Sequence, residues 1–209
     1  MLPLKGIRIL DLTTINPFTD TEFSDYGAEV IKVERPGSGD TIRDYPPFID
    51  GISAYHCYTD RGKKSITLNL KDDQGKEILK RLVKDADVLV ENFKNGTMEK
   101  MGLGFEELSK INPALVYGKL SSYGSTGPQK DYIAYDIAVQ AQSGIMDATG
   151  DPEGEPPGWL LRQRPPVLHL SGTAIVLALY HAKKTGKGQR VEVSMLDSVA
   201  SVMGERWPP

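Results

Sequence analysis

Short apolar runs alternate with charged, helical segments along the chain. Six runs are rich in β-branched residues and predict buried strands, at residues 6–12, 28–34, 65–70, 87–92, 114–120 and 190–195. Four segments between them carry apolar residues at helical spacing, at residues 72–86, 105–112, 135–146 and 172–184. Mostly apolar strands that alternate with helices are typical of a parallel sheet. The pattern therefore predicts an α/β fold, a Rossmann-like open parallel sheet with helices on both faces.

One stretch departs from this pattern. Residues 154–174 read GEPPGWLLRQRPPVLHLSGTA and show no clear period. No aspartate occurs between Pro152 and Leu196, although the chain contains 28 Asp and Glu residues. The stretch either carries the chemistry of the protein or has lost it.

The bulk composition narrows the class of protein. A chain of 209 residues with 39% hydrophobic and 25% charged residues is ordinary for a globular domain. The net charge of −3 implies no basic face, so we expect no nucleic-acid partner. The single Cys57 has no internal disulfide partner and favours a reducing cytoplasm. The N-terminus lacks a signal-peptide pattern and the longest apolar run, residues 174–179, is short, so we expect no membrane partner.

The first predicted strand, turn, helix and second strand have the layout of a dinucleotide-binding unit. Such a unit requires a GxGxxG turn, but residues 11–20 read DLTTINPFTD and contain no glycine. We therefore expect no nicotinamide site. Glu34, at the end of the second strand, is interpreted as a solvated strand end. Because the three histidines have no metal-ligand spacing, we also expect no metal site.

Several cations follow predicted strands or lie in adjoining loops. They are Arg35, Lys63, Lys64, Lys71, Lys94 and Lys100. Ligands of open α/β sheets bind beyond the carboxyl ends of the strands, where lysine and arginine suit a ligand with several phosphates. Scattered surface lysines are the alternative reading. The glycine-rich loop at residues 121–131 either brings backbone N–H groups to a ligand or is a plain turn.

Seven segments, in order along the chain, resemble class III coenzyme A transferases, the family of the formyl-CoA, carnitine-CoA and aryl-lactate CoA-transferases. They are LPLKGIRILDLT, GAEVIKVERPGSGDTIR, DRGKKSITLNLK, ADVLVENFKNGTMEKMGLGFEEL, INPALVYGKLSSYGSTGP, YDIAVQAQSGIMDATGDPEG and KKTGKGQRVEVSMLDSV. The resemblance covers nearly the whole chain except residues 13–24 and 158–174. It implies an enzyme that moves coenzyme A between carboxylic acids, with CoA and acyl-CoA as substrates and no permanently bound cofactor.

The family fold implied by the resemblance is larger than this chain. It has a Rossmann-like large domain built from both ends of a longer chain, a small domain between them, and two chains interlocked as a homodimer. Residues 1–209 would then be the N-terminal part of a truncated large domain, without the small domain and the C-terminal segment.

The family's CoA contacts can be carried over onto matching motifs. They fall on Arg35, Leu68, Asn69, Leu70, Lys71, Asn92, Phe93, Lys100, Met101, Tyr135 and Asp136. Lys100 stands where arginine is frequent, which keeps the charge but loses the planar fork. Acyl-CoA racemases of the family look like GHD where this chain reads AYD, so Tyr135 argues against a racemase.

The resemblance implies an aspartate nucleophile, which this chain lacks. Counting back from Gln189, which closes the TGKGQ motif, the family position falls on Arg164, or near His169 with a gap. The nearest carboxylates, Glu153 and Glu155, lie upstream in a turn. We therefore expect a catalytically impaired transferase. The alternatives are a non-catalytic CoA-binding or dimer-pairing module and, less favoured, a racemase-like enzyme.

Overall fold

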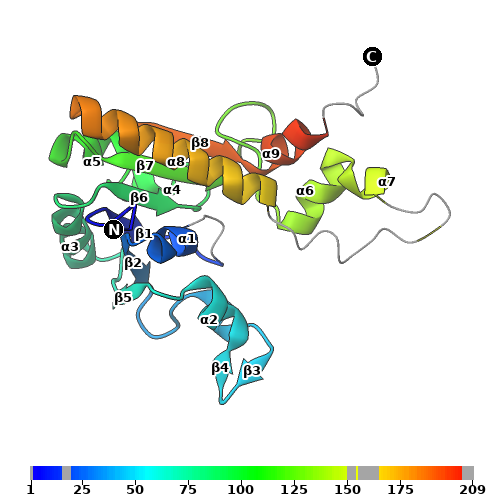
Figure 1. Ribbon diagram of the computed structural model, residues 1–209, viewed down its shortest axis with the longest axis horizontal. Coiled ribbons are helices and arrows are strands. Elements are labelled where there is room, and N and C mark those ends of the chain that lie inside the picture. Colours follow the sequence, from blue (N-terminus) through cyan, green and yellow to red (C-terminus); the bar gives the residue numbers. More distant parts are fainter. Residues whose placement is uncertain (1, 16–19, 150–153, 155–164, 204–209) are drawn as a thin grey trace.

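A six-stranded parallel sheet forms the centre of the molecule (Figure 1). The computed structural model describes residues 2–15, 20–149, 154 and 165–203. The strands are β1 (Arg8–Asp11), β2 (Glu29–Glu34), β5 (Lys64–Thr67), β6 (Val88–Glu91), β7 (Val116–Ser121) and β8 (Arg190–Ser194). Their order is β5-β2-β1-β6-β7-β8 and every neighbouring pair is parallel. The predicted open parallel sheet is confirmed.

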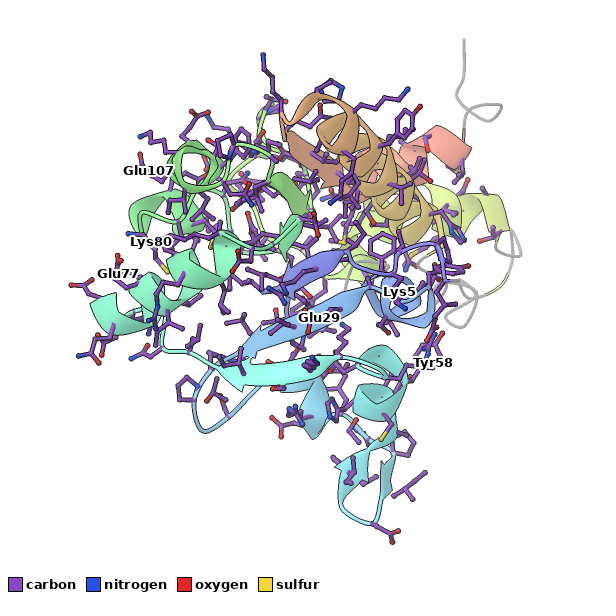
Figure 2. All side chains as sticks on the ribbon, turned by 60° about the vertical axis from the view of Figure 1, so that its left-hand side comes forward. Lys5, Glu29, Tyr58, Glu77, Lys80 and Glu107 are labelled. Atoms are coloured by element: carbon purple, nitrogen blue, oxygen red, sulfur yellow. The ribbon has the colours of Figure 1, made fainter. Side chains whose placement is uncertain are left out.

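Helices cover both faces of this sheet, as predicted. Alternate strand residues point to opposite faces. Ile9 and Val88 belong to an apolar cluster with residues of α1 (Asp20–Asp25) and α8 (Pro165–Thr185). Leu10 and Leu89 belong to a second cluster with residues of α3 (Asp73–Val83), α4 (Thr97–Lys100) and α5 (Phe105–Ile111). Figure 2 shows Glu77, Lys80 and Glu107 on the outer sides of α3 and α5, away from the sheet.

Smaller elements connect these layers. The 3-10 helix η1 (Thr41–Asp44), the hairpin of β3 (Phe48–Ile49) and β4 (Ile52–Ser53), and α2 (Ala54–Thr59) lie between β2 and β5 in the sequence. In Figure 1 the hairpin and α2 project from the β5 side of the molecule. After β7 come α6 (Asp136–Ser143) and α7 (Ile145–Thr149), and α9 (Met195–Val202) follows β8.

Three differences between the predicted and the observed elements concern segments that carry predicted site residues. β5 ends at Thr67, so Leu68–Lys71 follow the strand instead of completing it. The helix predicted over residues 135–146 is divided at Gly144, whose φ of 76° is left-handed and ends α6. α8 begins at Pro165, within the stretch that shows no clear period, because proline is tolerated in the first turn of a helix.

None of the described helices is both long and apolar enough to cross a membrane.

Candidate functional site

The order of the strands reverses between β1 and β6, so the carboxyl ends of these two strands flank the switch point of the sheet. Ligands of open α/β sheets bind in the crevice outside this point. The side chain of Asn92, directly after β6, bridges the two loops there. Its Oδ1 accepts the N–H of Thr14 at 3.0 Å, and its Nδ2 donates to the carbonyl of Thr14 at 2.9 Å. A predicted site residue therefore holds together the two loops of the switch point.

The loop after β1 is held by side chains instead of glycines. The N–H of Thr13 donates to Asp11 Oδ1 at 2.8 Å, and the N–H of Ile15 donates to Asp40 Oδ1 at 3.1 Å. With the Thr14 N–H bonded to Asn92, three successive N–H groups have carboxylate or amide acceptors. A dinucleotide turn uses such N–H groups to bind a pyrophosphate. Because they are occupied here, the geometry disfavours a nicotinamide dinucleotide at this turn.

A cluster of buried charges lies beneath this loop. The ammonium group of Lys32, in the middle of β2, contacts Asp40 at 2.8 Å and Asp11 at 3.2 Å. Lys63 contacts Asp11 at 2.9 Å and Asp60 at 3.1 Å. The Lys32 side chain is only 2% exposed. Burial would lower the pKa of Lys32, but the carboxylates of Asp11 and Asp40 outweigh burial and raise it. The ammonium group of Lys32 therefore stays charged.

Glu34 is buried at the end of β2, so its interpretation as a solvated strand end is wrong. Its two carboxylate oxygens accept hydrogen bonds from Arg43, at 2.7 and 2.6 Å. Ser65 and the N–H of Asp40 donate to the same carboxylate. The hydrogen bonds from Arg43, with those from Ser65 and Asp40, outweigh burial and lower the pKa of Glu34 to about 2.

His56 extends this network on the side of α2. Its Nε2 lies 2.9 Å from the Arg43 guanidinium and its Nδ1 lies 2.8 Å from Asp60. Because a guanidinium can only donate, Nε2 accepts and the proton of the neutral ring is on Nδ1. His56 therefore joins the Glu34–Arg43 pair to the charges beneath the loop after β1.

A second buried cluster supports the segment after β6. The carboxylate of Glu91, fully buried in the sheet, accepts hydrogen bonds from Lys119 and Tyr117, both at 3.1 Å. It also accepts the N–H of Phe93 at 2.7 Å. Burial raises the pKa of Glu91 in spite of these donors, and burial together with the neighbouring Glu91 raises the pKa of Tyr117. The buried carboxylate of Glu91 thus holds the backbone at Phe93, a predicted site residue.

The predicted CoA contacts near β2, β5 and β6 lie on one edge of the sheet. The N–H of Leu68 donates to the carbonyl of Glu34 at 2.9 Å, which joins the segments after β2 and β5. The apolar members of the set pack in or against one core cluster. They are Leu68, Leu70, Phe93 and Met101.

The cationic members of the set are exposed to solvent. Arg35 directly follows β2, Lys71 lies between β5 and α3, and Lys100 ends α4. Among the described residues, no carboxylate lies within ion-pair distance of these three side chains. Asn69 is also exposed. These groups are available to an anionic ligand.

Tyr135 and Asp136 lie apart from the predicted contacts that follow β2 and β5. Tyr135 precedes α6 and is 77% exposed, and Asp136 in the first turn accepts a hydrogen bond from Gln140. Figure 1 shows α6 on the β7–β8 side of the sheet, away from the ends of β2 and β5. The structure does not bring these two residues together with Arg35 and Lys71.

Two other cations predicted as possible ligand contacts have different roles. Lys63 and Lys64 precede or begin β5, so they lie at its amino end. Lys63 is buried in the charge cluster described above, and Lys64 pairs with Glu29 at 2.6 Å on the surface. Neither side chain is available at the carboxyl ends of the strands.

A small cleft opens at the carboxyl ends of β6 and β7. Its lining consists of Asn92, Phe93, Lys94, Asn95, Ser121, Ser122, Lys130, Tyr132 and Ile133. Asn95 donates to the carbonyls of Gly124 and Lys130, at 2.9 and 2.6 Å, and so ties the glycine-rich loop over the cleft. Two members of the predicted set, Asn92 and Phe93, therefore share a cleft with two lysines.

The segment expected to carry the nucleophile is only partly described. Arg164, Glu153 and Glu155 lie outside the described residues. His169 is exposed in α8 and lines a hollow of about 280 Å³ between α1 and α8. Glu22 of α1 lines the same hollow. Glu22 is thus a carboxylate near this segment that the sequence alone did not indicate.

The sequence also missed the buried charges Asp11, Lys32, Asp40 and Asp60. A signal was present for one of them. Lys32 interrupts an apolar strand in a sheet predicted to be buried on both faces, and a buried lysine requires an acidic partner. Which carboxylates supply the pairing depends on contacts across the fold.

Comparisons with known proteins identify the family of this chain. A model of CoA-transferase family III matches residues 4–208. The chain belongs to CoA-transferase family III. An acetyl-CoA:oxalate CoA-transferase of Acetobacter aceti is 44% identical over 96% of this chain and 53% of the relative. A succinyl-CoA:glutarate CoA-transferase of Homo sapiens is 42% identical over 94% of this chain and 46% of the relative.

Solved structures of the family have the same fold. A CAIB/BAIF family protein from Brucella suis superposes with a TM-score of 0.89 at 37% identity, over 97% of this chain and 56% of that one. Rv3272 of Mycobacterium tuberculosis superposes with a TM-score of 0.88 at 36% identity, over 98% and 58%. This family III chain spans about half the length of the curated relatives it matches.

Proposed function

We propose that this chain provides the CoA-binding part of a CoA-transferase, an enzyme that moves coenzyme A from an acyl-CoA to a carboxylic acid. One observation carries the proposal. The cations Arg35, Lys71 and Lys100 are exposed, after β2, after β5 and at the end of α4. Cations at this edge suit the phosphates of CoA, and the chain belongs to a family whose named relatives use CoA thioesters.

Titration calorimetry with CoA tests this proposal. Arg35→Ala is expected to weaken CoA binding several-fold, because a charge-assisted bond to phosphate is lost and the site is partly solvated. Arg81→Ala is the matched control, since Arg81 is an exposed arginine near the far end of α3 and is expected to leave the affinity unchanged. Equal affinities for wild type and Arg35→Ala would remove Arg35 from the site.

We propose further that the acceptor is a short dicarboxylic acid. The names of several relatives include oxalate, glutarate, malate or mesaconate. In this chain, Lys94 and Lys130 line the cleft beside Phe93, where a second carboxylate would meet a cation. Saturation-transfer NMR in the presence of CoA is expected to detect glutarate but not propionate, and Lys130→Ala is expected to weaken the glutarate signal. Equal signals for both acids would contradict this assignment.

The covalent route of the family requires a carboxylate nucleophile. This chain lacks the aspartate that the resemblance implies for that role. A carboxylate oxygen attacks the thioester carbonyl, the C–S bond breaks, and CoA leaves as a thiolate with an anhydride remaining. The thiolate then attacks the enzyme side of the anhydride, which releases the donor acid and forms an enzyme-bound CoA thioester. Without an aspartate between Pro152 and Leu196, we propose that the chain is catalytically impaired.

A non-catalytic role in pairing with a second chain is the alternative. It is favoured by apolar side chains that remain exposed, among them Ile49 at 66% on the hairpin and Leu177 at 64% on α8. We propose a homodimer in a reducing cytoplasm, where the exposed Cys57 stays a free thiol. Light scattering of the 209-residue chain distinguishes a dimer from a monomer, and a concentration-independent monomer would contradict the proposal.

A further inference from the structure

Ile15 has an unusual backbone conformation at the switch point. Its φ is 61°, in the left-handed region that a β-branched residue such as isoleucine avoids. Strained residues of this kind persist only where surrounding contacts hold them, and they gather at ligand-binding sites. Some group of the protein must therefore hold Ile15 in this conformation.

Asp40 supplies such a restraint. Its carboxylate lies after β2, 25 residues from Ile15 in sequence, and accepts the N–H of Ile15 at 3.1 Å (Oδ1) and 3.3 Å (Oδ2). Asp40 is only 3% exposed. A buried carboxylate is costly unless it is paired, and Lys32 pairs with Asp40 Oδ2 at 2.8 Å.

Lys32 restrains the same loop at a second point. Its ammonium group donates to the carbonyl of Thr13 at 3.0 Å. Thr14, between the two, is held by Asn92 through its N–H and its carbonyl. The backbone from Thr13 to Ile15 is thus fixed by side chains of β2, of the segment after β2 and of the segment after β6.

We propose that Asp40 is a positioning residue for CoA binding. Its carboxylate keeps the loop Thr13–Ile15 in the shape that meets the ligand at the switch point, and Lys32 keeps that carboxylate in place. The inference rests on the proposed function, because it takes an acyl-CoA as the ligand of the switch point. Asp40 itself does not touch the ligand.

Asp40 also caps η1, so its effect on the loop must be separated from a structural effect. Its Oδ1 accepts the N–H of Ile42 at 3.1 Å. The amides of Ile15 and Ile42 therefore report two consequences of one substitution. The Ile15 amide reports the restraint on the loop, and the Ile42 amide reports the cap.

The test combines amide hydrogen exchange by NMR with CoA titration. Asp40→Ala is expected to accelerate exchange at Ile15 and to weaken CoA binding about tenfold, because binding must then also order the released loop. Asp40→Asn keeps an oxygen acceptor of the same reach and is expected to restore slow exchange at Ile15 and part of the affinity. Asp44→Asn changes an exposed carboxylate in the same 3-10 helix and is expected to change neither.

The outcomes separate this inference from the proposed function. If the wild-type protein does not bind CoA, the proposed function fails, and CoA is then not the ligand of the loop Thr13–Ile15. If wild type binds CoA and Asp40→Ala accelerates exchange at Ile42 only, with unchanged affinity, Asp40 is a cap and the positioning role is overturned. If Asp40→Ala fails to fold, Asp40→Asn decides. In Asp40→Asn, slow exchange at Ile15 together with reduced CoA affinity then supports the positioning role of the Asp40 charge. Fast exchange at Ile15 together with wild-type CoA affinity overturns that role.

Discussion

The carboxylate of Glu34 accepts two hydrogen bonds from the guanidinium of Arg43, at 2.7 and 2.6 Å. Glu34 directly precedes Arg35, the predicted phosphate contact. Glu34 is buried and accepts further hydrogen bonds from Ser65 and the N–H of Asp40. The pair therefore fixes the end of β2 and the first residues of the loop that follows it.

Arg43→Gln is expected to lower the free energy of unfolding at pH 7 by about 1–2 kcal/mol, because the Glu34 carboxylate loses its charged donor in a partly solvated pair. The pKa of Glu34 is lowered from 4.5 to about 2, so this stabilisation is present above pH 4.5 and is lost as the pH falls towards 2. Urea unfolding at several pH values should show the gap between wild type and Arg43→Gln closing over this range.

Arg190→Gln is the control for this pH dependence. Arg190 pairs with Glu192 at 3.1 Å in a partly exposed contact at β8. Arg190→Gln is expected to lower the free energy of unfolding at pH 7 by less than Arg43→Gln does. A gap between wild type and Arg43→Gln that stays constant from pH 7 to pH 2 would refute the assigned role of Glu34.

Lys32→Met is expected to destabilise the fold by about 3–5 kcal/mol, because the buried carboxylates of Asp11 and Asp40 lose a common partner. Methionine approximates the length of lysine, so packing changes little. Since the pKa of Lys32 is raised above 10.5, its stabilisation is complete below that pH and is lost as the pH rises further. The difference in the free energy of unfolding between wild type and Lys32→Met should therefore be similar at pH 7 and pH 10, as measured by denaturant unfolding. A loss of stability below about 1 kcal/mol would contradict the role of Lys32 as the shared partner of these carboxylates.

The sequence predicted the sheet well because apolar strands and helical periodicity are local properties. It predicted a helix over residues 72–86 from apolar residues at helical spacing, and α3 (Asp73–Val83) lies within that range. It could not predict the charge cluster, because the pairing of Lys32 with Asp11 joins two different strands. It could not predict the bridge from Asn92 to Thr14 either, because these residues lie 78 positions apart in the chain. Glu34 was misread for the same reason, since nothing near it in sequence shows that Arg43 turns back onto it.

Gly75 in α3 approaches the backbone of Asn69 so closely that a Cβ at this position would overlap the Asn69 carbonyl. Alanine normally stabilises a helix relative to glycine by about 1 kcal/mol. Here we expect the reverse: Gly75→Ala should destabilise the protein, displace Leu68–Lys71 and weaken CoA binding. Gln74→Ala, at an exposed neighbouring position, is the control. Unfolding and CoA titration check both variants, and a more stable Gly75→Ala protein with unchanged affinity would show that the contact relaxes freely.

The last prediction concerns the covalent step, and we expect none in this chain. Arg164 stays protonated and cannot form an anhydride. An acyl group on His169 would hydrolyse instead of passing CoA to an acid. Loss of a nucleophile commonly costs many orders of magnitude in rate. Incubation with succinyl-CoA should therefore give no enzyme-bound CoA thioester by intact-mass spectrometry, while the full-length acetyl-CoA:oxalate CoA-transferase of Acetobacter aceti, with its own substrate, serves as the positive control.

An adduct in this experiment would have an informative position. Glu22 lines the same hollow as His169, so it is the described carboxylate placed to replace the missing aspartate. Peptide mapping to Glu22, and loss of the adduct in Glu22→Gln, would show that a residue of α1 has taken over the nucleophilic role. An adduct at Asp151, Glu153 or Glu155 would place the nucleophile upstream of α8. Either result would overturn catalytic impairment, because a carboxylate within reach of the thioester carbon is what the covalent route requires.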